Sequence, residues 1–416
     1  MTIKKETAYY DCQKRGIDFL SKNKYGLLAF EQGLGKTLTS LSNRDLNFNS
    51  KILVVCPAYL VFNWKDEIKL HTNFNLSQFT IISYERMTRD LEKLIDTFFD
   101  SIIFDESHYL KNKDAKRTKA AFKIVITVKP KNLALLTGTP AKNRVESLWS
   151  QIRLIALGRY IPYFPLSLYA FRKRFIEYEL LQYGSLTVEK EVGIKNTDEL
   201  REILKSAMLI EKVKDNLDLP DATSLLISLE KSREDIGMQS AFTSVNRDLF
   251  NLEKSHISSF KRDVAIIKTG VTIQFIRDFY SSSTGKSLVV FSCHPDAVTC
   301  IAESLDKFKI PNFKVDQKMS AEERNKVKNA FQEGEKRILI ATIGTFSTGV
   351  TLTKAHHMIF NDYPWDIDDL EQAKSRIRRI GQKNPCFYHF VVTGPLDKQI
   401  LKTISQKKDI KKEAGL

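Results

Sequence analysis

The glycine-rich string GLGKT, which begins at Gly33, has the residue types that surround a chain of phosphates. Gly33, Leu34 and Gly35 would form a tight loop whose backbone N–H groups approach phosphate oxygens. Lys36 would reach the outer phosphates, and the Thr37 hydroxyl would coordinate magnesium. A glycine turn that caps a helix is the alternative. The phosphate-binding interpretation is favoured because a strand-like run precedes the string and a helix-like run follows it.

The string DESH supplies two adjacent carboxylates. Asp105 follows the apolar run IIF, which places it at the end of a strand, where its carboxylate can face magnesium. Glu106 could then polarise the attacking water. A carboxylate pair in this position can instead cap the following helix. With GLGKT upstream, we expect the metal and water roles.

A cluster of arginines lies in the string QAKSRIRRIGQ near the C-terminus. Arg376 and Arg379 are three residues apart, so a helix would direct both to one face. If that face approaches ATP, one or both act as arginine fingers, which raise turnover by about 10³- to 10⁵-fold. The alternative is a patch that binds a phosphate backbone, a role that Arg378 fits better. LTGTP, at 136–140, supplies hydroxyls and a strand-to-helix turn.

Short apolar runs alternate with amphipathic, helix-length stretches from 26 to 156, which is typical of a parallel α/β sheet. GLGKT, DESH and LTGTP each follow such a run. Because open α/β sheets bind ligands at the carboxyl ends of their strands, we expect the three strings to converge.

A second alternation covers 263–416 and lacks a phosphate loop of its own. Its expected strands are SLVVF, FKV, RILIAT, HHMIF and FYHFVV. Its expected helices are Pro295–Phe308, Ala321–Gln332, Asp366–Arg379 and Leu396–Lys408.

The stretch between the two alternations, 157–262, has few strand-like runs. It contains the aromatic and basic stretch LYAFRKRFIEY, long polar helical segments and a predicted hairpin around Tyr183–Ser185. We therefore expect an N-terminal lobe at 1–156, a largely helical insertion at 157–262 and a C-terminal lobe at 263–416.

Composition excludes several classes of protein. The chain has 416 residues, of which 42% are hydrophobic and 28% charged, enough for two or three domains with their own cores. No apolar run approaches the roughly 18 residues that cross a bilayer. The N-terminal residues lack the apolar block of a signal peptide. Five cysteines without CxxC spacing indicate neither zinc nor disulfides, and favour a reducing, intracellular setting.

The net charge of +15 favours a polyanionic partner, although lysines can also simply solvate a surface, and an acidic membrane surface is a further alternative. The basic residues are clustered, which favours a nucleic-acid track. The clusters are Lys111, Lys113, Lys116, Arg117 and Lys119 after DESH, the triplet at 172–174, and the lysines near the C-terminus.

Six blocks in order resemble the Swi/Snf-type ATPases of helicase superfamily two, over almost the whole chain. They are LAFEQGLGKT, VVCPAYLVFNWKDEI, IISYERM, DESHYLKNKDAKRTKA, LTGTPAKNRVESLW and YPWDIDDLEQAKSRIRRIGQ. The last two, with the stretch ending FRKRF and with ELREILKSAMLIEKVKDNLDLP, are most similar to the distant branch of annealing helicases, which remodel forks. The chain departs from the family at Phe30, at IEK (210–212) in place of paired arginines, and at DQKMSAEER in place of DGS.

The resemblance implies an α/β fold with two RecA-like parallel-sheet lobes that use ATP and Mg²⁺. It also implies that Gln13 contacts adenine and that Gly349 and Thr351 lie in a coupling motif. His108 would couple the nucleotide site to the neighbouring motif, or would be a satisfied histidine between lobes.

The candidate DNA contacts are Trp64, Lys111, Asn112, Lys142, Asn143 and Arg144. The alternative for Trp64 is core packing, and for the lysines a solvated face. Contacts of this kind go to phosphates and carry little sequence preference.

We therefore expect a DNA-dependent ATPase that translocates on duplex DNA and remodels forks or migrates branches in replication, recombination or repair. A nucleotide-gated DNA clamp and an RNA helicase are the alternatives. No segment fits a bromodomain, zinc module or histone reader, so we expect a compact phage or bacterial type rather than a chromatin remodeller. A monomer in the cytoplasm of a bacterial or phage-infected cell would fit this type, or the nucleus in a eukaryote.

Overall fold

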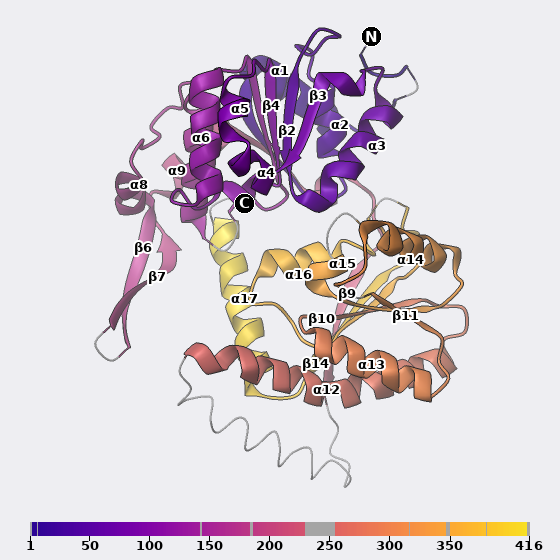
Figure 1. The fold of residues 1–416 in the computed structure, drawn as a ribbon. Helices are drawn as coiled ribbons and strands as arrows, with labels where there is room; N and C mark the ends of the chain where they lie inside the picture. Colours follow the sequence, from indigo (N-terminus) through magenta and orange to yellow (C-terminus); the bar gives the residue numbers. More distant parts are fainter. Residues whose placement is uncertain are drawn as a thin grey trace. The chain divides into compact units, whose positions relative to one another are not determined.

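The computed structural model describes residues 2–5, 7–141, 144–183, 186–228, 254–315, 317–346, 350–379 and 381–413. The chain divides into two compact units, one comprising 1–217 with 407–416 and the other 218–406 (Figure 1). Each unit is built on a six-stranded sheet whose paired strands are all parallel. The predicted α/β fold with two parallel-sheet lobes is confirmed.

The first sheet has the strand order β3-β2-β4-β5-β1-β8. Alternate residues of its strands enter two separate cores, with Leu27 in one and Leu28 in the other. Burial on both faces explains why these strands are almost continuously apolar. The strands are β1 (Tyr25–Phe30), β2 (Ile52–Cys56), β3 (Phe79–Ser83), β4 (Ser101–Asp105), β5 (Asn132–Leu136) and β8 (Met208–Glu211).

Helices cover both faces of this sheet, and Figure 1 shows α6 and α3 on opposite faces. The helices up to residue 155 are α1 (Asp11–Asn23), α2 (Lys36–Leu41), α3 (Val61–His71), α4 (Tyr84–Arg89), α5 (Leu91–Ile95), α6 (Lys116–Val128) and α7 (Leu148–Ile155). Short 3-10 turns lie at η1 (Ala58–Leu60), η2 (Leu76–Gln78), η3 (Ser107–Leu110) and η4 (Val145–Ser147).

The stretch expected as a largely helical insertion is divided between the two units at residue 217, and it contains four strands among its described residues. Strand β8 extends the first sheet beside β1, and β9 extends the second beside β14. The sequence has no turn residue before β8, since α9 ends at Ala207 and the strand begins at the next residue, Met208. The segments here are α8 (Leu168–Phe175), β6 (Ile176–Tyr183), β7 (Leu186–Ile194), α9 (Thr197–Ala207), α10 (Val213–Asn216) and β9 (Ala222–Ser228).

The hairpin predicted around Tyr183–Ser185 is present as the antiparallel pair β6 and β7. Figure 1 shows the two strands side by side, extending away from the first sheet. Its turn, at 184–185, lies outside the described residues.

The second sheet has the order β11-β12-β10-β13-β14-β9, and the five strands predicted for this lobe are confirmed. They are β10 (Leu288–Ser292), β11 (Asn312–Val315), β12 (Ile338–Thr342), β13 (His357–Phe360) and β14 (Cys386–Val392). The helices are α12 (Lys254–Ser282), α13 (Pro295–Lys307), α14 (Ala321–Glu333), α15 (Ile343–Phe346), α16 (Ile367–Lys374) and α17 (Pro395–Glu413).

The helix expected over Asp366–Arg379 is shorter than predicted, because α16 ends at Lys374. The Ser375 hydroxyl donates to the carbonyl of Gln372 at 2.7 Å, and the Arg376 N–H donates to that of Ala373 at 3.1 Å, which tightens the chain into turns. Within the described ranges, no helix is long and apolar enough to cross a membrane.

Candidate nucleotide-binding site

The GLGKT loop adopts a conformation that only glycine enters readily. Gly33 and Gly35 have φ angles of 92° and 74°, in the left-handed region. A Cβ atom on Gly35 would lie 2.1 Å from the Gln13 amide nitrogen. Gly35, the residue before α2, makes no side-chain cap hydrogen bond, and the start of a helix is a common place for a phosphate. The loop therefore fits the nucleotide that the sequence predicts.

Gln13 is buried directly against this loop, with 4% of its surface exposed. Its Nε2 donates to the carbonyl of Leu34 at 3.2 Å, and its Oε1 accepts the N–H of Tyr10 at 3.0 Å. The structure thus places Gln13 beside the phosphate loop, and the contact with adenine stays a prediction.

Lys36 lies between the phosphate loop and the LTGTP turn. Its Nζ donates to the carbonyl of Phe30 at 2.8 Å. A Cβ atom on Gly138 would lie 3.6 Å from the same nitrogen. The positive charge of Lys36 also lowers the pKa of Asp105. Two of the predicted strings, GLGKT and LTGTP, therefore meet at this ammonium group, and the field of its charge reaches DESH. Thr37 is half-buried in the first turn of α2.

Asp105 ends β4 as a buried carboxylate with 6% of its surface exposed. Burial, and then the neighbouring charge of Glu106, raises its pKa to about 6. Two donors oppose this: Trp64 Nε1 donates to Oδ2 at 2.8 Å, and the Glu106 N–H donates to Oδ1 at 2.9 Å. Each oxygen therefore receives one hydrogen bond from the protein and keeps a lone pair for a cation.

The prediction that Trp64 contacts DNA is wrong for this structure. Its side chain is fully buried, in the same core as Cys56 and Ile68. The alternative of core packing is correct but incomplete, because the indole also binds Asp105. Trp64 and Asp105 lie in separate blocks of the sequence, and neither block contains a signal that the two side chains pair.

Glu106 and His108 connect DESH to LTGTP. Glu106 has a left-handed φ of 51°, rare for a residue with a side chain and frequent at functional sites. His108 Nδ1 lies 3.2 Å from Glu106 Oε2 and 3.2 Å from Thr137 Oγ1. The Thr137 hydroxyl in turn accepts the N–H of Thr139 at 3.0 Å. The structure thus brings together the groups that the coupling prediction for His108 requires.

Gln151, on α7, is a buried member of this network that sequence reasoning missed. Its side chain is 0% exposed, and its Oε1 accepts the Ser107 hydroxyl at 2.8 Å. Its Nε2 donates to the carbonyl of Pro140 at 2.7 Å. The signal available was helical spacing in LWSQIRLI, which puts this amide on the same face as the apolar residues Leu148, Leu154 and Ile155.

The structure brings Arg376 and Arg379 together in the second unit. Nη1 of each lies near the carbonyl of Val350, at 3.4 Å and 3.2 Å respectively. Arg376 is 3% exposed and Arg379 is half-buried. Arg378 Nε donates instead to the carbonyl of Pro220 at 2.9 Å.

Gly349 lies outside the described residues, as do Lys142 and Asn143. The roles predicted for these three residues therefore stay predictions.

Three of the residues predicted to contact DNA line one pocket of about 560 Å³ in the first unit. They are Lys111, Asn112 and Arg144. Its other lining residues are Lys113, Asp114, Glu146, Ser147, Trp149, Ser150, Leu168 and Arg172. We call it the basic pocket, because four of its side chains are lysine or arginine and two are acidic.

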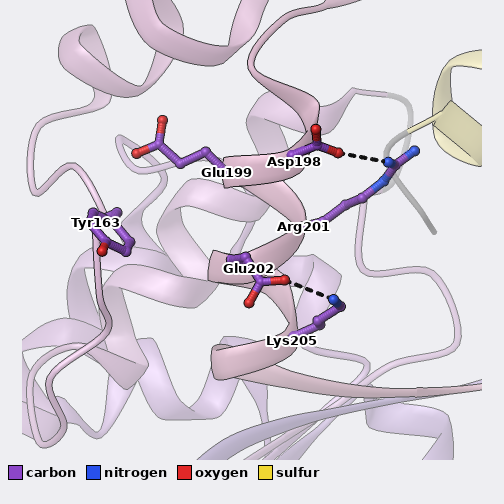
Figure 2. Close-up of a pocket in the computed structure, with 6 residues that line it drawn as sticks. All are labelled: Tyr163, Asp198, Glu199, Arg201, Glu202 and Lys205. Carbon is purple, nitrogen blue, oxygen red and sulfur yellow. Dashed lines mark hydrogen bonds and ion pairs between the residues drawn. The ribbon is translucent and has the colours of Figure 1, made fainter.

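A second hollow, of about 520 Å³, lies beside α9 and contains none of the predicted site residues. Figure 2 shows Tyr163 across from the acidic and basic side chains of that helix. Its charges are paired locally, Asp198 with Arg201 at 3.2 Å and Glu202 with Lys205 at 2.8 Å.

A glycine-rich loop with left-handed glycines, two adjacent carboxylates at the end of β4 and two parallel-sheet lobes are typical of the helicase class of ATPases. Residues 12–80 and 74–269 match the family described as SNF2-related domain, and residues 271–381 match the helicase conserved C-terminal domain. The chain belongs to the SNF2-related family of DNA-dependent ATPases and helicases.

Two relatives with similar sequences illustrate this family membership. The human "DNA annealing helicase and endonuclease ZRANB3" is 27% identical over 96% of this chain and 39% of its own length. The Caenorhabditis elegans "SWI/SNF-related matrix-associated actin-dependent regulator of chromatin subfamily A-like protein 1 homolog" is 27% identical over 97% of this chain and 61% of its own length. The chain thus spans only about two-fifths to three-fifths of these relatives.

A solved structure titled "Sulfolobus solfataricus SWI2/SNF2 ATPase core in complex with dsDNA" is similar at 21% identity. The match covers 97% of this chain and 92% of that one, with a TM-score of 0.44.

We predict that Trp64→Phe impairs magnesium-dependent ATP hydrolysis in a pH-dependent way. Loss of the indole N–H removes an interaction that lowers the pKa of Asp105, so that pKa rises above 6 and less carboxylate is ionised near neutrality. Turnover without DNA should fall by about tenfold near pH 6.5 and by clearly less near pH 8.5, where the carboxyl is ionised in both proteins.

The matched control is Trp149→Phe, which also removes an indole N–H bonded to an oxygen, the carbonyl of Pro165 at 2.9 Å. It should leave the pH profile unchanged. A Trp64→Phe profile parallel to that of the wild type would contradict the role given to this hydrogen bond.

Proposed function

We propose that this chain is an ATP-driven translocase that moves on duplex DNA and remodels or branch-migrates forked or junction DNA. The observation that carries the proposal is the basic pocket, since Lys111, Asn112 and Arg144 gather there in the unit that holds the nucleotide loop. Membership of the SNF2-related family supports the motor activity. The name of the human relative, an annealing helicase, supports branched DNA as the substrate.

In this proposal, the residues described above divide the nucleotide chemistry among them. The Gly33–Gly35 loop binds the phosphates through its backbone, and Lys36 leaves the carbonyl of Phe30 to bind them. Asp105 and Thr37 would hold magnesium, which neutralises charge on the phosphates when bound. Glu106 orients the attacking water, with His108 fixing its carboxylate. Arg379, the more exposed of the two arginines near Val350, would be the arginine finger that stabilises the charge developing on the phosphates.

DNA binding at the basic pocket goes through the phosphate backbone. Lys111, Arg144 and Arg172 supply positive charge, and Asn112 can donate from its amide. The Glu146 carboxylate accepts hydrogen bonds from the Arg172 guanidinium at 2.7 Å and from the Tyr178 hydroxyl at 2.8 Å. Tyr178, on β6, thus holds the carboxylate that positions Arg172. Contacts with phosphates do not distinguish one base sequence from another. Because they are electrostatic, binding should weaken steeply as the salt concentration rises.

We predict that the protein displaces the third strand from a DNA triplex when ATP is present. A translocase moves along the duplex and removes the obstacle, whereas a nucleotide-gated clamp hydrolyses ATP and leaves the triplex intact. Displacement is followed by the release of a labelled third strand on a native gel.

The Lys36→Ala variant is the control for this assay. It loses the ammonium group of the phosphate loop and should release no third strand, while still binding duplex DNA at low salt. Release without hydrolysable ATP, or hydrolysis by the wild type without release, would rule out translocation.

We predict that Arg144→Gln weakens duplex binding by about fivefold to tenfold at low salt, equally for unrelated sequences, and lowers the salt slope of log K by about 1. Fluorescence anisotropy over a salt series measures both quantities. Arg201→Gln is the matched control, since it removes the same charge from the hollow of Figure 2. Equal losses in the two variants would mean that the basic pocket is not the DNA site.

A further inference from the structure

Gln151 is a fully buried amide whose hydrogen bonds all go to loops rather than to its own core. A buried amide costs free energy unless its donors and acceptor are paired, so a residue of this type in a helix core needs specific partners. Its Oε1 accepts from the Ser107 hydroxyl, and its Nε2 donates to the carbonyls of Pro140 and, at 3.3 Å, Ser147.

Two of the three partners of Gln151 belong to DESH and LTGTP, two of the strings that form the proposed nucleotide site. Ser107 follows the carboxylates of Asp105 and Glu106, and Pro140 ends LTGTP. One side chain on α7 therefore joins the two loops through Ser107 and Pro140, whereas His108 joins them through Thr137. A displacement of α7 would move both loops together.

The neighbours of Gln151 on the same helix and in the turn before it face the basic pocket. Ser150 donates from its hydroxyl to the carbonyl of Lys111 at 2.7 Å, and Ser147, Trp149 and Ser150 all line the pocket. Gln151 itself does not line it. Adjacent residues of one helix thus contact the candidate DNA site and the loops of the nucleotide site.

We propose that Gln151 is the positioning residue that couples DNA bound in the basic pocket to ATP hydrolysis. Phosphates drawn to Lys111 and Arg144 pull on the N-terminal end of α7 through Ser150 and the η4 turn. Gln151 carries this displacement to Ser107 and Pro140, which sets the Glu106 carboxylate relative to the phosphate loop. This inference rests on the proposed function, because it requires that DNA binds at the basic pocket.

The test compares ATP turnover with and without duplex DNA in Gln151→Met, which keeps the side-chain length and removes all three hydrogen bonds. The ratio of stimulated to unstimulated turnover should fall by about tenfold, a typical size for coupling between sites. The dissociation constant for duplex DNA at low salt should stay within about twofold of the wild type, since Gln151 does not line the pocket. A purely structural defect would lower both rates together and leave their ratio unchanged.

Gln78→Met is the matched control. Its Nε2 also donates to three backbone carbonyls, those of Asn47, Phe48 and Ser50, in loops away from this network. It should leave the ratio at the wild-type value.

A double-mutant cycle tests the path itself. Ser107→Ala removes only the hydroxyl that donates to Gln151, and its effect on the ratio should not add to that of Gln151→Met if both act through this bond. Ser150→Ala, a smaller change on the pocket side, should lower the ratio in the same direction and replaces Gln151→Met if that variant does not fold.

The outcomes separate the two proposals. If duplex DNA does not stimulate the wild type, the proposed function fails and the coupling with it. If DNA stimulates the wild type, but Gln151→Met and Ser150→Ala keep the wild-type ratio, the coupling role of Gln151 is overturned and the proposed function stands. Additive effects of Ser107→Ala and Gln151→Met would also overturn it.

Discussion

The nucleotide site depends on keeping one buried carboxylate ionised. Asp105 is almost fully enclosed, and burial favours its neutral form, yet the magnesium-binding role proposed for it requires the charged form. The indole N–H of Trp64, the backbone N–H of Glu106 and the charge of Lys36 hold the pKa to about 6, below neutrality. The buried tryptophan on α3 is therefore part of the site, although it contacts neither nucleotide nor DNA.

The strand order positions the other groups around this carboxylate. Strands β4, β5 and β1 are neighbours in the first sheet, so DESH, LTGTP and GLGKT leave the same edge side by side. Hydrogen bonds then join DESH to LTGTP, through His108 and Thr137 and through Gln151. A site linked in this way can respond to a displacement of α7, the helix that also borders the basic pocket.

Much of the first sheet, and the meeting of GLGKT, LTGTP and DESH at one edge of it, was predictable, because buried parallel strands are apolar runs and the three strings follow such runs directly. The pairing of Trp64 with Asp105, and that of Gln151 with Ser107, was not predictable, since each hydrogen bond joins segments that are distant in the sequence. Strand β8 was not predicted, because α9 ends directly before it and no turn residue separates the two. The end of α16 was predicted too late in the sequence, because the apolar spacing continues past Lys374. The helix ends there because the Ser375 hydroxyl and the backbone form tighter turns.

The measurement that tests the account most directly is ATP hydrolysis by the wild-type protein with single-stranded, duplex, forked and four-way DNA, and with duplex RNA. A motor whose nucleotide site responds to DNA in the basic pocket should turn over slowly alone. It should accelerate by about tenfold or more with DNA that contains duplex, and not with RNA. Equal turnover with and without DNA, or stimulation by RNA alone, would contradict the account.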